Sequence, residues 1–549
     1  MDEDLFTAIA EIAARLAVIL SPERSNACFE AVFRGDATTL QTSGVSLPLD
    51  HKGRCELIAA ARGLGVLLDR RIRSELLSSL PDVSVDELFS KTSVAKSGYR
   101  LSSAYSSAEK RNVVLSQDFV RGSAWSSLVA EAMSLPAACA GSRVGLARAE
   151  FEVIQPYIDL PPLHAYQAEV QAKLLERLRS GKPQRCMVTL PTGGGKTRVM
   201  VDTLFKVAAL ERGEGPVLWL AQHEELCEQA VQCFTDVWRS RSRPGNRSLI
   251  IQRVWGHIAE EIDIDADVVV GIPESVVPRL RSYSEAGFRF FCIVIDEAHN
   301  ANDSVYNEVL ALGCGAVIVG LTATPATGNE IGTTNLIARF HRNIIVPPSL
   351  AAGAIWKLQE QGYLAHIDIE ELHTSYRLDG AVTTKDQVEF TSDALRAAGN
   401  SAGRNVRIIE RLKEIRGSES VLCFASSVAS ARILAAILAR SGRRAASVDA
   451  YTDRVQRADL IARFKRGDLQ FLFNFGVLAT GFDAPKVDVL VMARPTLSPV
   501  LLEQMLGRGL RGPRNGGTER CLIIWVLDGM AEHGVSPLGY ERFLHSWRR

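Results

Sequence analysis

The chain has 549 residues, of which 46% are hydrophobic and 23% are charged, as in ordinary globular proteins. This length corresponds to three or four domains at about 100–200 residues each. Lysine plus arginine and aspartate plus glutamate both number 63, so the formal net charge is zero. The chain therefore lacks the overall basic charge of a protein that coats nucleic acid, although a neutral chain can still carry a local basic cleft.

Cysteine usage and hydropathy indicate an intracellular protein, and we expect it in the cytoplasm. The ten cysteines include no Cys-x-x-Cys pair, which favours reduced and mostly buried thiols. No apolar run reaches the ~18 residues of a transmembrane helix. The chain begins with acidic residues at Asp2, Glu3 and Asp4, unlike the basic start of a secretory signal.

The N-terminal part has helical periodicity. Apolar residues recur at helical spacing over 5–20 and 56–80, which predicts a mainly helical accessory domain over residues 1–155. It contains no constellation of residues with an obvious chemical task. Its role is left open by the sequence.

The residue pattern changes near residue 160, where short Val/Ile/Leu-rich runs begin to alternate with amphipathic helical stretches. The apolar runs span 186–190, 216–221, 266–272, 291–296, 316–323, 420–426, 445–451, 469–475, 487–493 and 520–526. Such alternation predicts parallel sheets covered on both faces. Because Pro347 and Pro348 interrupt it, we expect two α/β lobes at 156–345 and 401–549, joined by a connector at 346–400. One large doubly wound domain is the alternative.

A glycine-rich segment follows the first apolar run and precedes an amphipathic helical stretch, which is the context of a phosphate-binding loop. Its residues are Pro191, Thr192, Gly193, Gly194, Gly195, Lys196 and Thr197. The glycines let the backbone approach a phosphate, and the following helix start faces the anion. Lys196 supplies a positive charge for the β- and γ-phosphates, and Thr197 is a candidate Mg²⁺ ligand. Leu190 stands where the general pattern has its first glycine.

An acidic segment lies about one hundred residues after Lys196, at the end of another apolar run. Asp296 is placed to hold Mg²⁺, and Glu297 to orient or deprotonate the attacking water. His299 is a candidate sensor of the γ-phosphate, with a purely structural role as the alternative. Thr322 and Thr324 end the next run, where their hydroxyls can bond the carboxylates of the acidic segment; an ordinary strand-end turn is the alternative, which these two residues taken alone would favour.

At this point the sequence resembles superfamily 2 helicases. PTGGGKT, IDEAH and LTATP occur in the order of the first lobe's motifs, and the second lobe has counterparts of motifs IV, V and VI at 421–438, 473–485 and 504–512. The resemblance covers about 160–530. Within the superfamily the chain is similar to the DEAH-type group that contains type III restriction subunits (ResIII) and RadD-like repair ATPases. Three sequence segments show this closer similarity: EQMLGRGLRGPRNGG, KLQEQGYLA and VLWLAQHEELCEQA.

The resemblance implies two tandem RecA-like lobes that hydrolyse ATP with Mg²⁺ between them. Arg508 and Arg511 would reach across as arginine fingers, and Gln504 would help contact the nucleotide. Gly481 and Asp483 of motif V would link the nucleotide site to the nucleic acid. Gln167 in LHAYQ resembles the residue that reads adenine, although Ala165 replaces a proline common in relatives. A helix-capping role is the alternative for Gln167.

Nucleic-acid contacts are expected only by region, around Gln222, His223 and Glu225, around Pro273 and Glu274, and at Thr480.

The function expected from all this is an ATP-dependent helicase or translocase, acting on DNA in repair, restriction or phage defence. An RNA-remodelling ATPase and a catalytically silent scaffold for nucleic acid or a partner are the alternatives. No nuclease signature follows the second lobe, so a motor with partner subunits bound through residues 1–155, or a stand-alone helicase, is expected.

Overall fold

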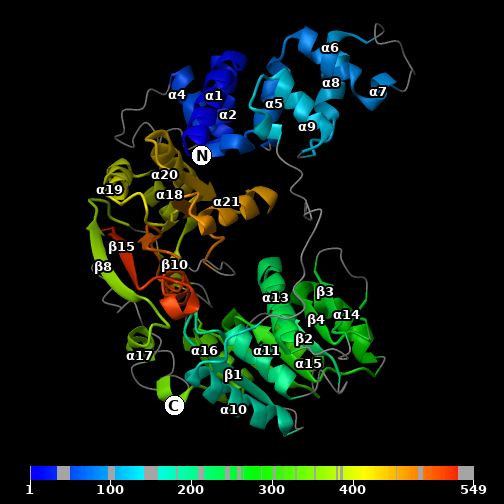
Figure 1. Ribbon diagram of the computed structural model, residues 1–549, viewed down its shortest axis with the longest axis vertical. Coiled ribbons are helices and arrows are strands. Elements are labelled where there is room, and N and C mark those ends of the chain that lie inside the picture. Colours follow the sequence, from blue (N-terminus) through cyan, green and yellow to red (C-terminus); the bar gives the residue numbers. More distant parts are fainter. Residues whose placement is uncertain are drawn as a thin grey trace.

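The structure is a computed structural model, and it describes most of the chain. The described residues are 2–33, 50–67, 69–96, 105–120, 122–140, 159–180, 184–207, 215–241, 248–255, 261–263, 265–285, 287–300, 304–312, 315–327, 330–350, 354–378, 381–383, 388–452, 454–479 and 486–528. Three layers follow one another along the molecule: the N-terminal helices, the second lobe and the first lobe (Figure 1). Within the described ranges, no helix has the length and apolar character needed to cross a membrane.

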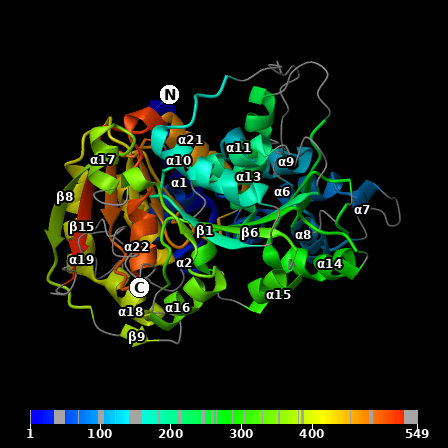
Figure 2. The ribbon, with the colours of Figure 1, turned by 90° about the horizontal axis from the view of Figure 1, so that it is seen from below.

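The first lobe contains a parallel sheet, as the alternating pattern predicts. Its strands, in the order β3-β4-β2-β5-β6-β1-β7, are Ile251–Val254, Val268–Gly271, Val217–Leu220, Cys292–Asp296, Val317–Thr322, Arg185–Thr189 and Ile344–Ile345. Its main helices are α10 (Ala165–Arg179), α11 (Lys196–Lys206), α13 (Glu224–Arg241), α14 (Pro273–Glu285), α15 (Ser304–Leu312) and α16 (Glu330–Arg339). Helices α11 and α13 cover one face of the sheet, and α14 and α15 cover the other (Figure 2).

The second lobe has its own parallel sheet, so the single doubly wound domain is wrong. Its strands, in the order β12-β13-β11-β14-β15-β8, are Ala445–Val448, Phe471–Asn474, Val421–Phe424, Val489–Met492, Arg520–Leu527 and His366–His373. Its helices are α18 (Ser392–Asn400), α19 (Ala402–Lys413), α20 (Val428–Arg440), α21 (Arg454–Arg466) and α22 (Pro499–Leu506). The fold class, two tandem RecA-like lobes, is confirmed.

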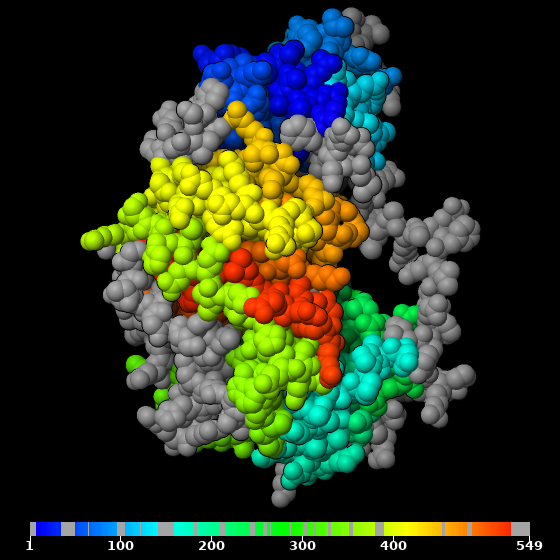
Figure 3. All heavy atoms as spheres, turned by 60° about the vertical axis from the view of Figure 1, so that its left-hand side comes forward, coloured from blue at the N-terminus to red at the C-terminus, as the bar shows by residue number. Residues whose placement is uncertain are grey.

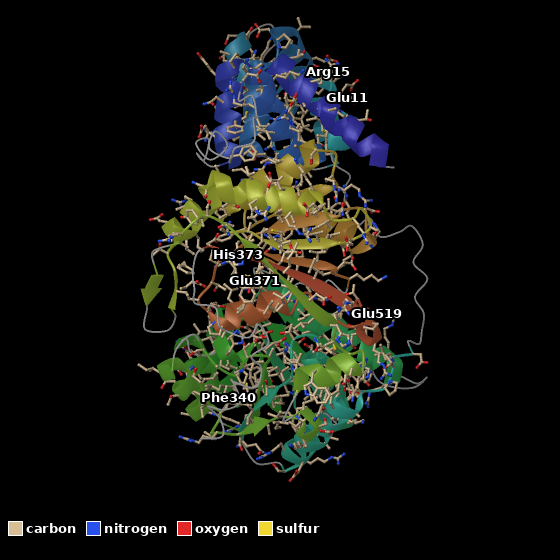
Figure 4. All side chains as sticks on the ribbon, turned by 90° about the vertical axis from the view of Figure 1, so that its left-hand side faces the viewer. Glu11, Arg15, Phe340, Glu371, His373 and Glu519 are labelled. Atoms are coloured by element: carbon tan, nitrogen blue, oxygen red, sulfur yellow. The ribbon has the colours of Figure 1, made fainter. Side chains whose placement is uncertain are left out.

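The range 346–400, expected to be a connector, contains regular structure. It contains η5 (Pro348–Leu350) and α17 (Ala354–Glu360), and then supplies β8, which pairs in parallel with β15 over its whole length. Figure 4 labels Glu371 and His373 near the end of this strand. A small antiparallel hairpin of β9 (Ala381–Thr383) and β10 (Val388–Phe390) follows. Because β8 alternates charged with apolar residues, it contains no continuous apolar run that would predict a buried strand.

The described N-terminal part is helical, as predicted. Its elements are α1 (Asp2–Ile19), α2 (Pro22–Phe33), α4 (His51–Arg62), η1 (Gly63–Gly65), α5 (Arg70–Ser79), α6 (Asp82–Ser90), α7 (Ser93–Lys96), α8 (Ser107–Ser116), α9 (Ala124–Ala132) and η3 (Ala137–Ala140). These helices rest directly on the second lobe (Figure 3). They share one continuous apolar core with α19, α20 and the sheet of that lobe. Helix α20 is buried along almost its whole length between the two layers.

Candidate active site

The glycine-rich segment joins β1 to α11 at the carboxyl edge of the first sheet. Gly193 and Gly195 both adopt left-handed backbone angles, with φ of 78° and 77°, which a side chain would strain. Gly195 is the residue directly before α11, and Lys196 is the first residue of that helix. The free N–H groups of the first helical turn therefore face the loop, which is the geometry that binds a phosphate. The phosphate loop expected from the sequence has the required backbone shape.

Gln167, which lies on α10, stabilises this loop through a hydrogen bond. Its side chain is only 6% exposed. Nε2 donates to the carbonyl of Gly194 at 3.0 Å, and Oε1 accepts from the backbone N–H of His164 at 2.9 Å. The Tyr166 hydroxyl donates to the same Gly194 carbonyl at 3.2 Å. Gln167 thus caps α10 and holds the phosphate loop, which is the capping alternative from the sequence. Its contact with adenine stays a prediction.

The acidic pair lies at the carboxyl end of β5, two strands from the phosphate loop in the sheet order β5-β6-β1. Asp296 is 6% exposed and accepts a hydrogen bond from the backbone N–H of Glu297 at 3.0 Å. Burial, and then the negative charge of Glu297, raise the pKa of the Asp296 carboxyl to about 7, although the Lys196 ammonium acts to lower it. Glu297 has a left-handed backbone with φ of 49°, a strained conformation typical of functional sites.

His299 connects the acidic pair with the end of β6. Its Nδ1 lies 2.9 Å from the Thr322 hydroxyl and 3.3 Å from the Glu297 carboxylate. The Thr322 hydroxyl donates to the carbonyl of Thr324 at 3.1 Å, so it accepts from Nδ1–H of the imidazole. Burial lowers the pKa of His299, which keeps the ring neutral in this tautomer. The expectation that Thr322 and Thr324 bond the carboxylates is corrected, because both hydroxyls face His299.

Gln504 on α22 completes this arrangement from the second lobe. Its Nε2 lies 3.1 Å from Nε2 of His299, the ring nitrogen that accepts in the Nδ1–H tautomer. The resemblance implies that Gln504 contacts the nucleotide. In the structure its described partner is instead the histidine of the acidic segment.

A second contact joins the lobes at the phosphate loop itself. Gly507 lies so close to Thr192 that a methyl group on Gly507 would overlap the Thr192 side chain. The two lobes therefore meet directly over the loop. Sequence reasoning missed Gly507, although its place between Gln504 and Arg508 was the available signal.

The two expected arginine fingers follow Gly507, and the guanidinium of Arg508 contacts its own lobe. Nε and Nη2 of Arg508 donate to the carbonyl of Ala479 at 3.1 and 2.8 Å. Arg511 forms an isolated antiparallel bridge with Leu364 through its backbone. The motif V residues Gly481 and Asp483 lie outside the described residues. That either guanidinium group moves to contact a bound phosphate stays a prediction.

The side chains expected to hold Mg²⁺ are Thr197 and Asp296, which supply hydroxyl and carboxylate oxygens. These are the donors that Mg²⁺ prefers, and the ion ordinarily completes its shell with water and substrate phosphates. Among the described residues no cluster of three or more His, Cys, Asp or Glu could hold a metal alone. This donor set fits an ion that arrives together with a nucleotide.

Two regions expected to contact nucleic acid lie side by side. β2 and β4 are neighbours in register, with Leu220 opposite Gly271, and the N–H of Ala221 donates to the carbonyl of Gly271 at 3.1 Å. Gln222 and His223 therefore follow one strand, and Pro273 and Glu274 follow its neighbour. The side chain of Glu225 and the whole of Thr480 lie outside the described residues.

Two family models match this chain, one in each lobe. Residues 160–327 match the family model for the type III restriction enzyme res subunit, and residues 404–512 match the helicase conserved C-terminal domain. The chain is 25% identical over 401 residues to a putative ATP-dependent helicase, IRC3, of Saccharomyces cerevisiae, covering 69% of this chain. The match spans 54% of the yeast protein's length.

Two further likenesses concern proteins of archaea and bacteria. The chain is 22% identical over 482 residues to the DNA 3'-5' translocase XPB2 of Sulfurisphaera tokodaii, covering 78% of this chain and 97% of that protein. A fragment of a putative HsdR subunit of a type I restriction enzyme from Vibrio vulnificus matches with a TM-score of 0.48 and 19% identity, covering 69% of this chain and 67% of that one. The chain belongs to the superfamily 2 helicases, in the group that shares the ResIII-type first lobe.

Proposed function

We propose that the protein is an ATP-driven helicase or translocase that moves along DNA, in repair, restriction or phage defence. The observation that carries the proposal is the meeting of both lobes at one site. Gln504 bonds His299 at 3.1 Å, and Gly507 packs on Thr192 of the phosphate loop. Hydrolysis that changes this contact would move the lobes relative to each other, which is what a motor requires.

The chemistry follows from the residues at the loop. Lys196 binds the β- and γ-phosphates, and the first turn of α11 presents its free N–H groups to them. Thr197 and Asp296 would hold Mg²⁺, which would supply positive charge to offset the negative charge of the phosphates. Glu297 accepts the proton of the attacking water, helped by its place beside the buried His299. Arg508 leaves the Ala479 carbonyl and stabilises the transferring phosphoryl group together with Arg511.

DNA is preferred as the substrate because of the names of relatives, among them a DNA translocase. Protein partners are proposed to bind through residues 1–155, since two relatives are named as subunits of type I restriction enzymes. The alternative is an ATPase that remodels RNA, in which case RNA is the substrate instead of DNA.

The test is ATP hydrolysis measured with single-stranded DNA, duplex DNA and RNA. Lys196→Ala and Glu297→Gln should abolish stimulated turnover, and Arg508→Ala or Arg511→Ala should lower kcat by about 10³-fold with a small change in KM. Arg520→Ala is the matched control, because its guanidinium pairs with Asp368 at an exposed edge. Full stimulated turnover in folded Lys196→Ala and Glu297→Gln would reject the site. Stronger stimulation by RNA than by any DNA would reject DNA as the substrate.

A further inference from the structure

Residues 362–365, which lie between α17 and β8, form a short backbone ladder with the expected arginine finger Arg511. Leu364 and Arg511 lie opposite each other in an isolated antiparallel bridge. Beside this bridge, the backbone N–H of Gly512 donates to the carbonyl of Tyr363 at 3.1 Å. A methyl group on Gly512 would lie only 2.7 Å from the backbone of Leu364, so the two segments are in close contact. The backbone of Arg511 is therefore fixed to residues 362–365.

The side chain of Leu364 lies against the phosphate loop. A methyl group on Gly193 would meet Cδ2 of Leu364 at 3.9 Å. Leu364 is buried, and it belongs to the apolar core of the first lobe. Side chains of residues directly opposite each other in an antiparallel pair leave the ladder on the same face, with Cβ atoms about 4.5–5.5 Å apart. The side chain of Arg511 therefore starts on the face of the ladder that is turned toward the phosphate loop.

Tyr363 connects this ladder with the helix that supports the phosphate loop. Its side chain is buried, and its ring centre lies 5.5 Å from that of Tyr166 on α10. The hydroxyl of Tyr166 donates to the carbonyl of Gly194 in the loop at 3.2 Å. The ring of His164, directly before α10, lies 4.1 Å from the ring of Tyr363. Although Tyr363 precedes the strand β8 of the second lobe, its side chain is thus packed into the first lobe.

The segment that follows Arg511 holds Tyr363 from the other side. Nη1 of Arg514 donates to the Tyr363 hydroxyl at 3.1 Å, and the guanidinium carbon lies 5.1 Å from the ring centre. Nδ2 of Asn515 donates to the Tyr363 carbonyl at 2.9 Å, and Oδ1 of the same amide lies 3.3 Å from Nε2 of His164. Tyr363 is therefore held between α10 of the first lobe and the chain next to Arg511 in the second.

We propose that Tyr363 is a positioning residue for ATP hydrolysis, which sets the place of Arg511 relative to the phosphate loop. The inference rests on the proposed function, in which Arg511 stabilises the transferring phosphoryl group. Packing of the Tyr363 ring on α10 holds the ladder of Leu364 and Arg511 against the loop, so the guanidinium group starts close to the γ-phosphate of bound ATP. Tyr363 acts through Arg511 and needs no contact with the nucleotide.

The first test separates binding from catalysis in Tyr363→Ala. Loss of the ring should lower kcat of stimulated ATP hydrolysis by roughly 10²-fold, the cost of displacing a reacting group by about 1 Å, with little change in KM. The affinity for ADP with Mg²⁺ and aluminium fluoride, which imitates the transferring phosphoryl group, should fall by a similar factor. The affinity for ADP alone should stay at the wild-type value. Tyr363→Phe keeps the ring and should retain wild-type values throughout.

The second test is a double-variant cycle. Because a displaced finger no longer contributes, Tyr363→Ala/Arg511→Ala should have the same kcat as Arg511→Ala alone. Gly512→Ala disturbs the same ladder without changing the tyrosine, since its methyl group would overlap the backbone of Leu364, and it should also lower kcat. The matched control is Tyr283→Ala, a buried tyrosine on α14 that packs in the core on the other face of the first sheet. This control should keep wild-type kcat.

Chemical denaturation shows which variants are folded, and Gly512→Ala provides the test if Tyr363→Ala does not fold. Wild-type kcat in folded Tyr363→Ala or Gly512→Ala would overturn the inference, as would an equal loss of affinity for ADP alone, or losses that multiply in the double variant. These outcomes leave the proposed function in place if Arg511→Ala still lowers kcat. Wild-type kcat in Arg511→Ala would reject the finger itself, and the inference with it.

Discussion

Gln504 of the second lobe and His299 of the first lobe are joined by a hydrogen bond, with 3.1 Å between the Nε2 atoms. His299 in turn lies 3.3 Å from Glu297, the residue expected to activate water. Through Gln504, the position of the second lobe therefore affects the histidine that lies beside Glu297 in the first lobe.

Gln504→Ala should lower nucleic-acid-stimulated ATP turnover by about tenfold, because the second lobe then lacks the hydrogen bond that orients His299 beside Glu297. His299→Ala should have a similar effect, and the double variant should be little worse than either, with a coupling energy of about 0.5–3 kcal/mol. Steady-state ATPase assays measure this cycle. Gln232→Ala, an exposed glutamine on α13 that bonds Asp236, is the control. Additive losses would show that the two residues act independently.

Gly507→Ala should impair closure of the lobes, since the new methyl group would overlap the Thr192 side chain. A displacement of about 1 Å at a reaction centre costs roughly 10²-fold in rate, so kcat should fall by that order. Gly417→Ala is the matched control, because a methyl group there meets no atom within 4 Å. Turnover of Gly507→Ala equal to that of Gly417→Ala would mean that catalysis does not need this contact.

Gln167→Ala should weaken ATP and GTP binding in parallel, by about tenfold each, because the loss of its hydrogen bond to Gly194 loosens a loop that serves any nucleoside triphosphate. Equilibrium binding of fluorescent ATP and GTP analogues measures both affinities. The control is Gln171→Ala, a buried glutamine one turn further along α10 whose partners are Asp202 and Lys206. A selective loss of ATP binding would instead assign Gln167 to adenine recognition.

Asp296→Asn should stabilise the protein by an amount that grows with pH. The pKa of Asp296 is raised from 3.8 to about 7, so the folded state holds a proton that the unfolded state has lost. Stability therefore falls as the pH rises from about 4 to about 7, and the asparagine removes this loss. In chelator without nucleotide, the gain from pH 5 to pH 8 should be on the order of 1–3 kcal/mol by chemical denaturation. A stability gain that is constant over this pH range would mean that the pKa of Asp296 is close to that of an ordinary aspartate.

Arg432→Ala should cost about 3–5 kcal/mol of unfolding free energy, because it leaves Asp449 buried without its partner. Arg466→Ala is the matched control, since its exposed pair with Asp468 should contribute at most about 1 kcal/mol. Limited proteolysis should also cut Arg432→Ala faster in the N-terminal helices, because Nη1 of Arg432 donates to the carbonyl of Val32 on α2. Equal denaturation midpoints and cutting rates for the two variants would show that the buried pair does not hold these helices in place.

Local patterns predicted the phosphate loop and most strands of the two sheets, but not β3, β7 or β8. Continuous apolar runs define buried parallel strands, and Gly193 and Gly195 occupy backbone conformations that other residues avoid. Asp296 and Glu297 could be assigned to the same edge because carboxyl ends of parallel strands lie together. β8 escaped prediction because charged side chains alternate along an edge strand.

The sequence by itself determined the family, the lobe order and the residues available for chemistry, because these depend on short segments with their own backbone and burial requirements. Only the tertiary structure decided that Gln167 braces the loop, that Gln504 bonds His299, and that the N-terminal helices are held by Arg432, 400 residues away in sequence from Val32. Such contacts depend on how whole layers pack. No local periodicity encodes which distant side chain completes a buried hydrogen bond.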